Sequence, residues 1–296
     1  MIIERLIADK ARKEFIKGAT RTDKMRLEME QLPRDCDTEC DILYADTDIP
    51  ENKLDIYTRR GIEVGDEAFF LVHGGAFVYG SKELDKCFGM TLAVFSGMPV
   101  VNVNYHHMPE KTLIGVANDL CTAIDFLARD RGIRKVHLVG DSAGGYLVVL
   151  LACLLRSDAV RKDMNITIES DTEALSLASI CGIYEGERNS FPSIYFERPF
   201  GKEEGEAELP SYIYDTKEII RRTGFPRTCL ITGDKDFLHD VNVKMRDFLE
   251  GEGIPVKFFD AISSETKLAT HVFAISDPGW QESHTALNLI IENARG

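Results

Sequence analysis

The pentapeptide Gly140-Asp141-Ser142-Ala143-Gly144 joins a strand-like run to the apolar residues 146–155. It fits the G-x-S-x-G pattern, in which a serine occupies the sharp turn between a strand and a helix. Small residues let the backbone pass close to the turn, and the positive end of the helix favours a developing negative charge. We therefore predict Ser142 as a nucleophile, although the short pattern alone also fits an ordinary turn that contains serine.

A serine nucleophile needs a base, and an acidic residue must orient that base. Only His239, His271 and His284 follow Ser142 in the chain. His239 adjoins an acidic cluster, and His284 lies in the last helical pattern. His271 lies in a loop between the last strand and the last helix, at the edge where sites form in parallel sheets. We predict His271 as the base.

The acidic partner is expected between the serine and the base, because the order in sheets of this kind is Ser, Asp or Glu, His. The strand-like run 229–232 is followed by Asp234, Asp236 and Asp240. A turn residue and a helix N-cap are ordinary roles for aspartate at such places. The spacing alone leaves the three open.

A glycine-containing loop is predicted to supply oxyanion donors. His73-Gly74-Gly75-Ala76 follows an early strand-like run, as the oxyanion loop of esterases does. We predict the N–H groups of Gly75 and Ala76 as donors, together with that of Ala143, while Gly74 allows close approach. Two aromatic residues follow in the same loop, and they are candidates for the substrate pocket: Phe77 and Tyr79.

Strand-like and helical patterns alternate along the chain, which predicts a largely parallel sheet with helices on both faces. Two early segments, ECDILYAD and KLDIYTRR, alternate apolar and polar residues and suit an antiparallel edge. The predicted strands are 68–73, 100–105, 136–139, 177–183, 229–232 and 256–260. The predicted helices are 84–95, 113–129, 145–156, 240–250 and 280–293.

Two segments fall outside this alternation, and we predict that both form a cap over the strand ends. Residues 1–35 contain one or two amphipathic helices. Residues 184–225 are too long for a simple connection. They are rich in aromatic residues, among them Phe191, Tyr195, Phe196 and Phe200.

Charge and composition limit the partners. A net charge of −14 argues against nucleic acid and anionic lipid surfaces. No targeting segment or membrane span is recognisable, so we expect a cytoplasmic protein. The seven cysteines are interpreted as plain thiols, because the spacing of Cys36 and Cys40 lacks a second metal-binding pair. We expect no metal or cofactor and a small-molecule substrate, and a homodimer is possible because dimers are the commonest oligomers.

Several motifs together resemble the α/β-hydrolases of the bacterial hormone-sensitive-lipase-like esterase family. They are HGGAF at 73–77, NYHHMPE at 104–110, GDSAGG at 140–145, DFLHD at 236–240 and HVF at 271–273. The resemblance implies one α/β-hydrolase domain over 1–296, with an eight-stranded sheet and a small helical cap. It implies a carboxylesterase that acts on short acyl esters without a cofactor. It also selects Asp236 as the acid, because the family aspartate opens a D-x-L-x-D pattern.

The sequence departs from that family at two places. Ala76 replaces the third glycine of the oxyanion loop, and it still supplies an N–H group. His106 and His107 are unexpected, and we assign them no catalytic role. Two alternatives stay open on the same fold: an amidase such as an arylformamidase, and a protein that binds a small ligand without turnover.

Overall fold

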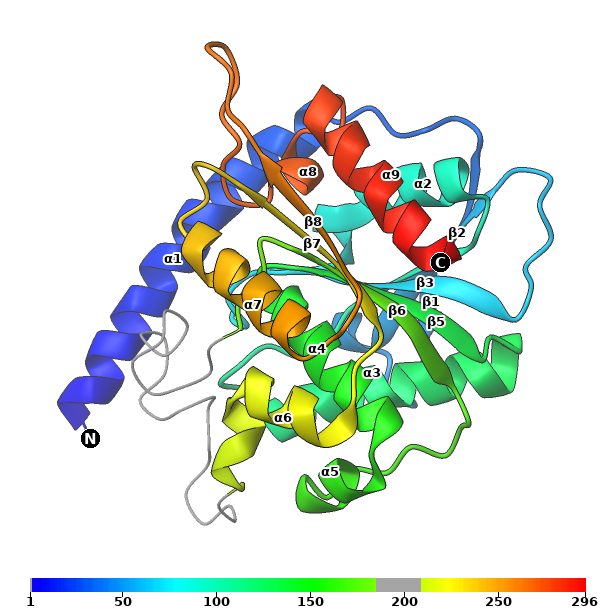
Figure 1. The fold of residues 1–296 in the computed structure, drawn as a ribbon, viewed down its shortest axis with the longest axis vertical. Coiled ribbons are helices and arrows are strands. Elements are labelled where there is room, and N and C mark those ends of the chain that lie inside the picture. The colour runs from blue at the N-terminus through cyan, green and yellow to red at the C-terminus, as the bar shows by residue number, and fades with distance from the viewer. Residues whose placement is uncertain (1, 185–208) are drawn as a thin grey trace.

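The computed structural model describes residues 2–184 and 209–296, which are built around one twisted eight-stranded sheet (Figure 1). The strand order is β1-β2-β4-β3-β5-β6-β7-β8. The strands are β1 (Cys36–Leu43), β2 (Lys53–Arg59), β3 (Glu67–Val72), β4 (Val100–Val103), β5 (Lys135–Asp141), β6 (Glu173–Ile180), β7 (Arg227–Gly233) and β8 (Val256–Ala261).

The helices of the described residues lie mostly between these strands in the chain. They are α1 (Ile2–Met29), α2 (Lys86–Ser96), α3 (Leu113–Phe126), α4 (Ala143–Arg156), α5 (Asp158–Asp163), α6 (Thr216–Thr223), α7 (His239–Gly251), α8 (Phe273–Ser276) and α9 (Gln281–Arg295). α3 runs on into a π-helical turn over Leu127–Arg131.

Strand direction follows the sequence patterns. β1 pairs with β2, and β2 with β4, in antiparallel fashion. The pairs from β4 through β3, β5, β6 and β7 to β8 are all parallel. The predicted α/β-hydrolase sheet with an antiparallel edge is therefore confirmed. The strand ends differ by a few residues from the prediction: β5 and β7 extend beyond their apolar runs, whereas β4 ends at Val103 and β6 at Ile180.

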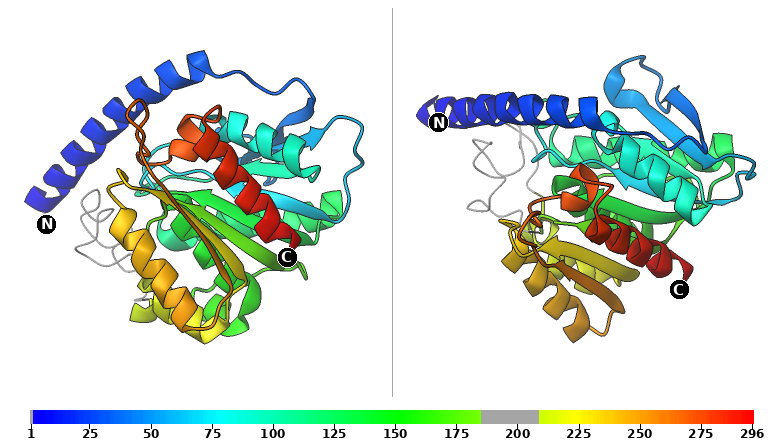
Figure 2. Two further views of the ribbon diagram at one scale, coloured as in Figure 1. Left: turned by 45° about the horizontal axis from the view of Figure 1, so that its top comes forward. Right: turned by 90° about the horizontal axis from the view of Figure 1, so that it is seen from above.

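Two hydrophobic cores lie on the two faces of the sheet. Figure 2 shows the helices that cover each face. α3, α4 and α7 bury their apolar residues on one face. α2 and α9 pack on the other face. The uninterrupted apolar run of α4 is explained by its position, because every residue from Ala143 to Leu154 is buried.

The N-terminal segment forms a single long helix, α1, rather than two. Figure 2 shows α1 lying along one side of the molecule, with its N-terminal end projecting beyond the sheet. Of the second predicted cap segment, the structure describes residues 209–225, which contain α6. Its aromatic residues Phe191, Tyr195, Phe196 and Phe200 lie outside the described residues.

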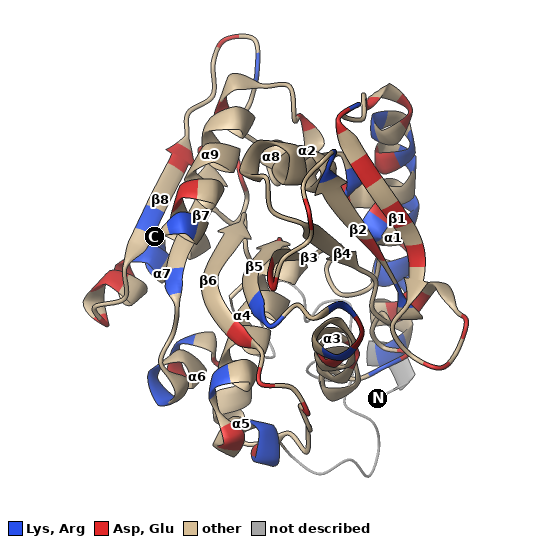
Figure 3. Ribbon diagram, turned by 90° about the vertical axis from the view of Figure 1, so that its right-hand side faces the viewer, with Lys and Arg blue, Asp and Glu red and all other residues tan. Residues whose placement is uncertain are grey.

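Charged residues lie mainly on the peripheral elements. Figure 3 shows acidic and basic positions interspersed along α1, α5 and α6, while the central strands carry few. Among the helices that the structure describes, none combines the length and apolar character needed to cross a membrane.

Candidate active site

Ser142 occupies a strained turn between β5 and α4. Its backbone has φ 50° and ψ −114°, a conformation that side-chain-bearing residues rarely adopt. The turn is so tight that a Cβ atom on Gly144 would lie 2.0 Å from the carbonyl oxygen of Val72, and one on Gly140 would lie 2.4 Å from that of Gly144. The glycine spacing of the motif is thus a steric requirement of the turn.

The structure brings Ser142, His271 and Asp236 together from three separate connections. Nε2 of His271 lies 2.9 Å from Oγ of Ser142, and Nδ1 lies 2.8 Å from Oδ1 of Asp236. His271 is placed by the loop between β8 and α8, and Asp236 by the turn after β7. With an ionised Asp236, Nδ1 carries the proton and Nε2 is left to accept the serine hydroxyl proton.

Asp236 is held as an anion by several donors. It is buried, and its carboxylate accepts hydrogen bonds from the backbone of Leu238 at 3.0 Å and from Oγ1 of Thr232 at 3.1 Å. Burial raises the pKa of Asp236, but the neighbouring His271, Leu238 N–H and Cys181 thiol together bring the pKa below its ordinary value. A charged carboxylate is what the orienting role requires.

The other two candidate acids have different surroundings. Asp234 accepts the backbone N–H of Ser263 at 2.9 Å and forms part of a turn. Asp240 lies in the first turn of α7 with a largely exposed side chain. Neither has a described contact with His271, so the geometry favours Asp236.

The glycine loop lines the same cavity as Ser142. Gly74, Gly75 and Ala76 all contribute to its wall. Gly75 and Ala76 have positive φ values of 115° and 53°, so the chain turns sharply at the two predicted donors. Ala143 is the first residue of α4 and is buried, and the first N–H groups of a helix have no partner within it.

The cavity beside Ser142 has a volume of about 360 Å³. Tyr79 lines it, as does the half of α1 that contains Phe15, Asp23 and Arg26. Phe77 is not among the residues that line this cavity. It is fully buried, and its ring packs edge-on against Tyr146 at 5.7 Å between centroids.

Four other histidines, His106, His107, His239 and His284, have partners outside the proposed triad. Nδ1 of His106 lies 2.8 Å from Asp119, and His107 packs edge-on against the ring of Tyr105. Nε2 of His239 lies 2.9 Å from Asp260, and this contact raises the pKa of His239. The ring of His284 lies 6.0 Å from that of Phe95.

Sequence reasoning missed Cys181, which follows β6 and contacts the acid. Its thiol lowers the pKa of the neighbouring Asp236, and its Sγ accepts the backbone N–H of Val272 at 3.3 Å. Cys181, Asp236 and His271 have ligand-type atoms within 4.8 Å of one another, the arrangement that could hold a metal ion. Within this cluster, His271 and Asp236 are joined by the hydrogen bond of 2.8 Å described above.

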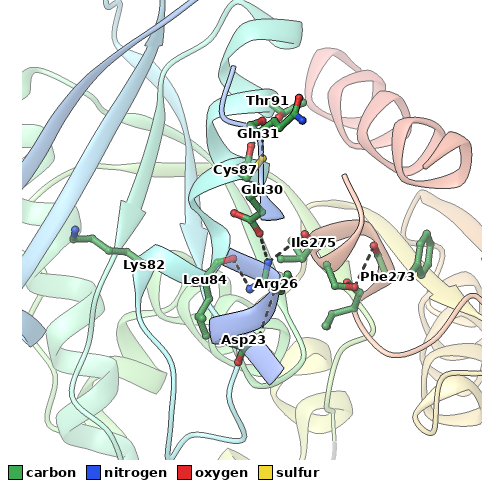
Figure 4. A network of polar contacts seen from close by, with 12 residues as sticks. Asp23, Arg26, Glu30, Gln31, Lys82, Leu84, Cys87, Thr91, Phe273 and Ile275 are labelled. Atoms are coloured by element: carbon green, nitrogen blue, oxygen red, sulfur yellow. Dashed lines mark hydrogen bonds and ion pairs between the residues drawn. The ribbon is translucent and has the colours of Figure 1, made fainter. Parts of the chain in front are cut away.

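Arg26 was also missed, and it closes one side of the site. Figure 4 shows this side chain reaching from α1 to two other segments. It donates to the carbonyl oxygen of Leu84 at 2.9 Å and to that of Ile275 at 3.5 Å, and it pairs with Glu30 at 2.6 Å. Nothing in the pattern of α1 distinguishes Arg26 from the other basic residues of that helix.

Comparison with known proteins gives one family and a set of relatives. A family model described as alpha/beta hydrolase fold matches residues 69–273. A probable isoprenylcysteine alpha-carbonyl methylesterase of Oryza sativa subsp. japonica is 26% identical over 66% of this chain and 49% of its own length. The carboxylesterase/phospholipase LipF of Mycobacterium tuberculosis is 25% identical over 66% of this chain and 55% of its own. The chain thus spans about half the length of these curated relatives.

Solved structures share the fold over nearly the whole chain. Esterase B from Lactobacillus rhamnosis has a TM-score of 0.87 at 22% identity, covering 100% of this chain and 97% of the other. An esterase from the bacterial hormone-sensitive lipase family has a TM-score of 0.71 at 19% identity, covering 93% and 89%. The family expected from the motifs is confirmed by the matching family model, and the chain belongs to the alpha/beta hydrolase fold family.

Proposed function

We propose that this protein is a serine esterase that hydrolyses short-chain carboxylic esters through an acyl-enzyme. The observation that carries the proposal is the continuous contact from Asp236 through His271 to Ser142, with distances of 2.8 and 2.9 Å. The glycine loop beside it offers backbone donors at the same cavity. The names of the relatives, all esterases, point in the same direction.

In the acylation step, Oγ of Ser142 attacks the ester carbonyl carbon while Nε2 of His271 takes its proton. Asp236 stabilises the imidazolium that forms. The carbonyl oxygen becomes an oxyanion, and the N–H groups of Gly75, Ala76 and Ala143 bind it. Each such donor contributes about 3–4 kcal/mol to the transition state. The C–O bond to the alcohol then breaks, and the alcohol leaves with the proton from His271.

In the second step, water attacks the acyl group on Ser142 and gives its proton to His271. Collapse of the second tetrahedral intermediate breaks the bond to Ser142, which recovers the proton from His271. A carboxylic acid is released and the enzyme returns to its starting state. Every proton and electron pair is accounted for by the three side chains and water.

The preference for short acyl chains is supported by the size of the cavity. Its volume of about 360 Å³ is at the lower end of the range for small-molecule sites. We propose that α1 is part of a cap, because Phe15, Asp23 and Arg26 on it line that cavity. One of the similar structures, esterase B, was solved with a C4–C4 tributyrin phosphonate.

The first test is hydrolysis of p-nitrophenyl acetate, butyrate, hexanoate and dodecanoate. We expect rapid turnover of the short esters, and a loss of about 10⁴–10⁶-fold in kcat for Ser142→Ala and for His271→Ala. Ser170→Ala is a matched control, because Ser170 precedes β6 at the opposite end of the strands. It should retain the wild-type rate.

A p-nitrophenyl alkylphosphonate identifies the nucleophile independently of turnover. Oγ of Ser142 would attack phosphorus and displace p-nitrophenolate, so the phosphonyl mass should appear on the peptide that contains residues 135–156. Labelling of another residue, or losses under tenfold in both alanine variants, would contradict the triad. Rapid cleavage of p-nitroacetanilide with no cleavage of esters would favour the amidase alternative.

A further inference from the structure

Two aspartates outside the proposed triad lie beside the nucleophile. Asp141 immediately precedes Ser142 at the end of β5, and Asp85 ends a short 3₁₀ turn, Lys82–Asp85, before α2. Both line the cavity that contains Ser142. Asp85 is only 2% exposed and Asp141 only 6%, so neither carboxyl group is solvated as a surface aspartate would be.

Their hydrogen bonding is incomplete unless they share a proton. Within the described part of the chain, Oδ2 of Asp85 and Oδ1 of Asp141 are buried without a partner. The two carboxyl groups lie within hydrogen-bonding reach of each other. Two carboxylates offer only acceptors, whereas an acid and a carboxylate form a hydrogen bond that satisfies both oxygens. One proton between them removes both unpaired atoms and one of two buried negative charges.

The second interaction of Asp141 connects this pair to the oxyanion loop. Contact with the backbone N–H of Gly74 lowers the pKa of Asp141, so this N–H favours the charged carboxylate. The approach is so close that a Cβ atom on Gly74 would lie 2.4 Å from Oδ2 of Asp141. Gly74 directly precedes Gly75 and Ala76, so the position of Asp141 determines where the two proposed oxyanion donors lie.

We infer that Asp85 and Asp141 share one proton and together act as positioning residues for the glycine loop. Asp85 is the acid and donates to Asp141, and Asp141 is the carboxylate that holds the N–H of Gly74. This inference deepens the proposed esterase function, and its kinetic consequences rest on that function. The two residues act through the backbone donors that bind the oxyanion.

The electrostatic surroundings agree with this assignment. Burial, followed by the charge of Asp141, raises the pKa of Asp85 well above its ordinary value. Burial likewise raises the pKa of Asp141, while Asp85, His271, the Gly74 N–H and Arg26 oppose the rise. The charged and titratable groups that face the pair are Arg26 from α1, Glu30 just after it, His271, Cys181 and Tyr105.

The sign of the pH dependence follows from the raised pKa of Asp85. The stabilisation that the proton provides is complete below the unfolded-state pKa of about 4. It is lost as the pH rises through the higher pKa of the folded state. Loss of the proton places two negative charges side by side next to the developing oxyanion, so activity should fall on the same alkaline limb.

Two substitutions of Asp85 with similar shapes separate the proton from the packing. Asp85→Asn keeps a permanent donor toward Asp141, and we expect kcat within about threefold of wild type at neutral pH. We also expect its activity to persist at alkaline pH, where that of the wild type declines. Asp85→Leu leaves Asp141 without a donor and should lower kcat by about tenfold or more, with little change in KM. Asp247→Asn, an exposed α7 residue, is the matched control.

Two further measurements test the shared proton without an assay of ester hydrolysis. The infrared spectrum of the wild type at neutral pH should contain the carbonyl stretch of a protonated carboxyl group, which should be absent from Asp85→Asn. The melting temperature of the wild type should fall relative to that of Asp85→Asn as the pH rises above about 4. Both comparisons can be repeated in the Ser142→Ala background.

Failure of the shared proton can be distinguished from failure of the proposed esterase function. Identical alkaline limbs and identical pH dependence of melting in wild type and Asp85→Asn would overturn the shared proton, while leaving the esterase proposal intact. An Asp85→Asn variant as impaired as Asp85→Leu would also overturn it. A wild type with the infrared band and the pH-dependent melting, but without hydrolysis of any ester, would support the pair and refute the proposed function.

Discussion

Cys181 shows how a single thiol can serve the orienting acid. It sits at the end of β6 with a positive φ of 52° and is completely buried. Burial and the nearby Asp236 raise the pKa of Cys181 well above its ordinary value, so the thiol keeps its proton, and the thiol in turn lowers the pKa of Asp236. Its Sγ also accepts the N–H of Val272, the residue after His271. One sulfur atom thereby joins the acid to the segment that contains the base.

We expect Cys181→Ala to lower kcat about tenfold with little effect on KM, because the buried Asp236 loses a donor. Cys181→Ser retains a donor and an acceptor of similar size and should restore kcat to within about threefold. Steady-state kinetics with p-nitrophenyl butyrate measures both effects. Cys121→Ala removes an equally buried thiol from α3 and should leave kcat unchanged.

An unchanged kcat in Cys181→Ala would mean that the thiol only fills space. Equal losses of kcat in Cys181→Ser and Cys181→Ala would lead to the same conclusion, because serine keeps the hydrogen-bonding groups and is only smaller than cysteine.

A site residue could be predicted from the sequence where the residues that mark it lie close to it in the chain. The turn at Ser142 could be predicted because its steric demands fall on Gly140 and Gly144, close by in the chain. Asp85 and Cys181 could not, because they meet the site only through tertiary contacts. Phe77 was predicted beside the substrate on the basis of proximity in the loop, yet its side chain lies in the core. Adjacent residues in a sharply turning loop point to different sides.

At the level of elements, Arg26 connects α1 to two other segments of the site. The guanidinium joins α1 to the 3₁₀ turn that contains Leu84 and to α8 through Ile275. Glu30, which directly follows α1, pairs with Arg26, and burial of that carboxyl raises the pKa of Glu30 above its ordinary value. Removing the cation would leave a half-buried carboxylate without its partner.

Arg26→Met keeps the aliphatic stem and removes the guanidinium. We expect the free energy of unfolding to fall by about 2–3 kcal/mol, because carbonyl oxygens and Glu30 lose their donors. KM should rise more than kcat falls, because α1 forms part of the cavity wall. Urea titration and steady-state kinetics measure the two effects, and Lys24→Met, an exposed position on α1, serves as the control.

An Arg26→Met variant with the stability and KM of the wild type would refute the proposal that Arg26 holds α1 against the rest of the site. Greater sensitivity of α1 to limited proteolysis in Arg26→Met than in Lys24→Met would support it.

Helices and strands were predictable where the apolar pattern is long and periodic. The prediction places most element ends within a few residues of those observed. This holds for the central strands and for α2, α3, α4, α7 and α9. The short helices α5 and α8 were not predicted, because elements of six and four residues carry too few apolar positions to show a period. α1 was expected as one or two helices, and its continuity depends on packing that the pattern does not contain.

For the molecule as a whole, the seven cysteines have unequal access to solvent. All are free thiols. Only Cys40 is exposed, and the other six are buried. In addition, burial raises the pKa of Cys121, Cys153 and Cys229 to about 12, which keeps these thiols protonated. A thiolate is the reactive form, so both access and protonation protect the buried group.

We expect one thiol to react rapidly with Ellman's reagent in the native protein, and all seven after denaturation in guanidinium chloride. Cys40→Ser should abolish the rapid phase without changing stability by more than about 0.5 kcal/mol. A second fast thiol in the native state, or a rapid phase that persists in Cys40→Ser, would contradict the burial pattern.

The contact between Arg26 and Ile275 joins residues 249 positions apart, and that between Ser142 and His271 joins residues 129 apart. During synthesis, α1 leaves the ribosome long before the segment on which its arginine docks. The proposed nucleophile, Ser142, likewise emerges well before its proposed base, His271. The cavity wall and the proposed triad are therefore complete only after residues 271–275 have been made and have docked.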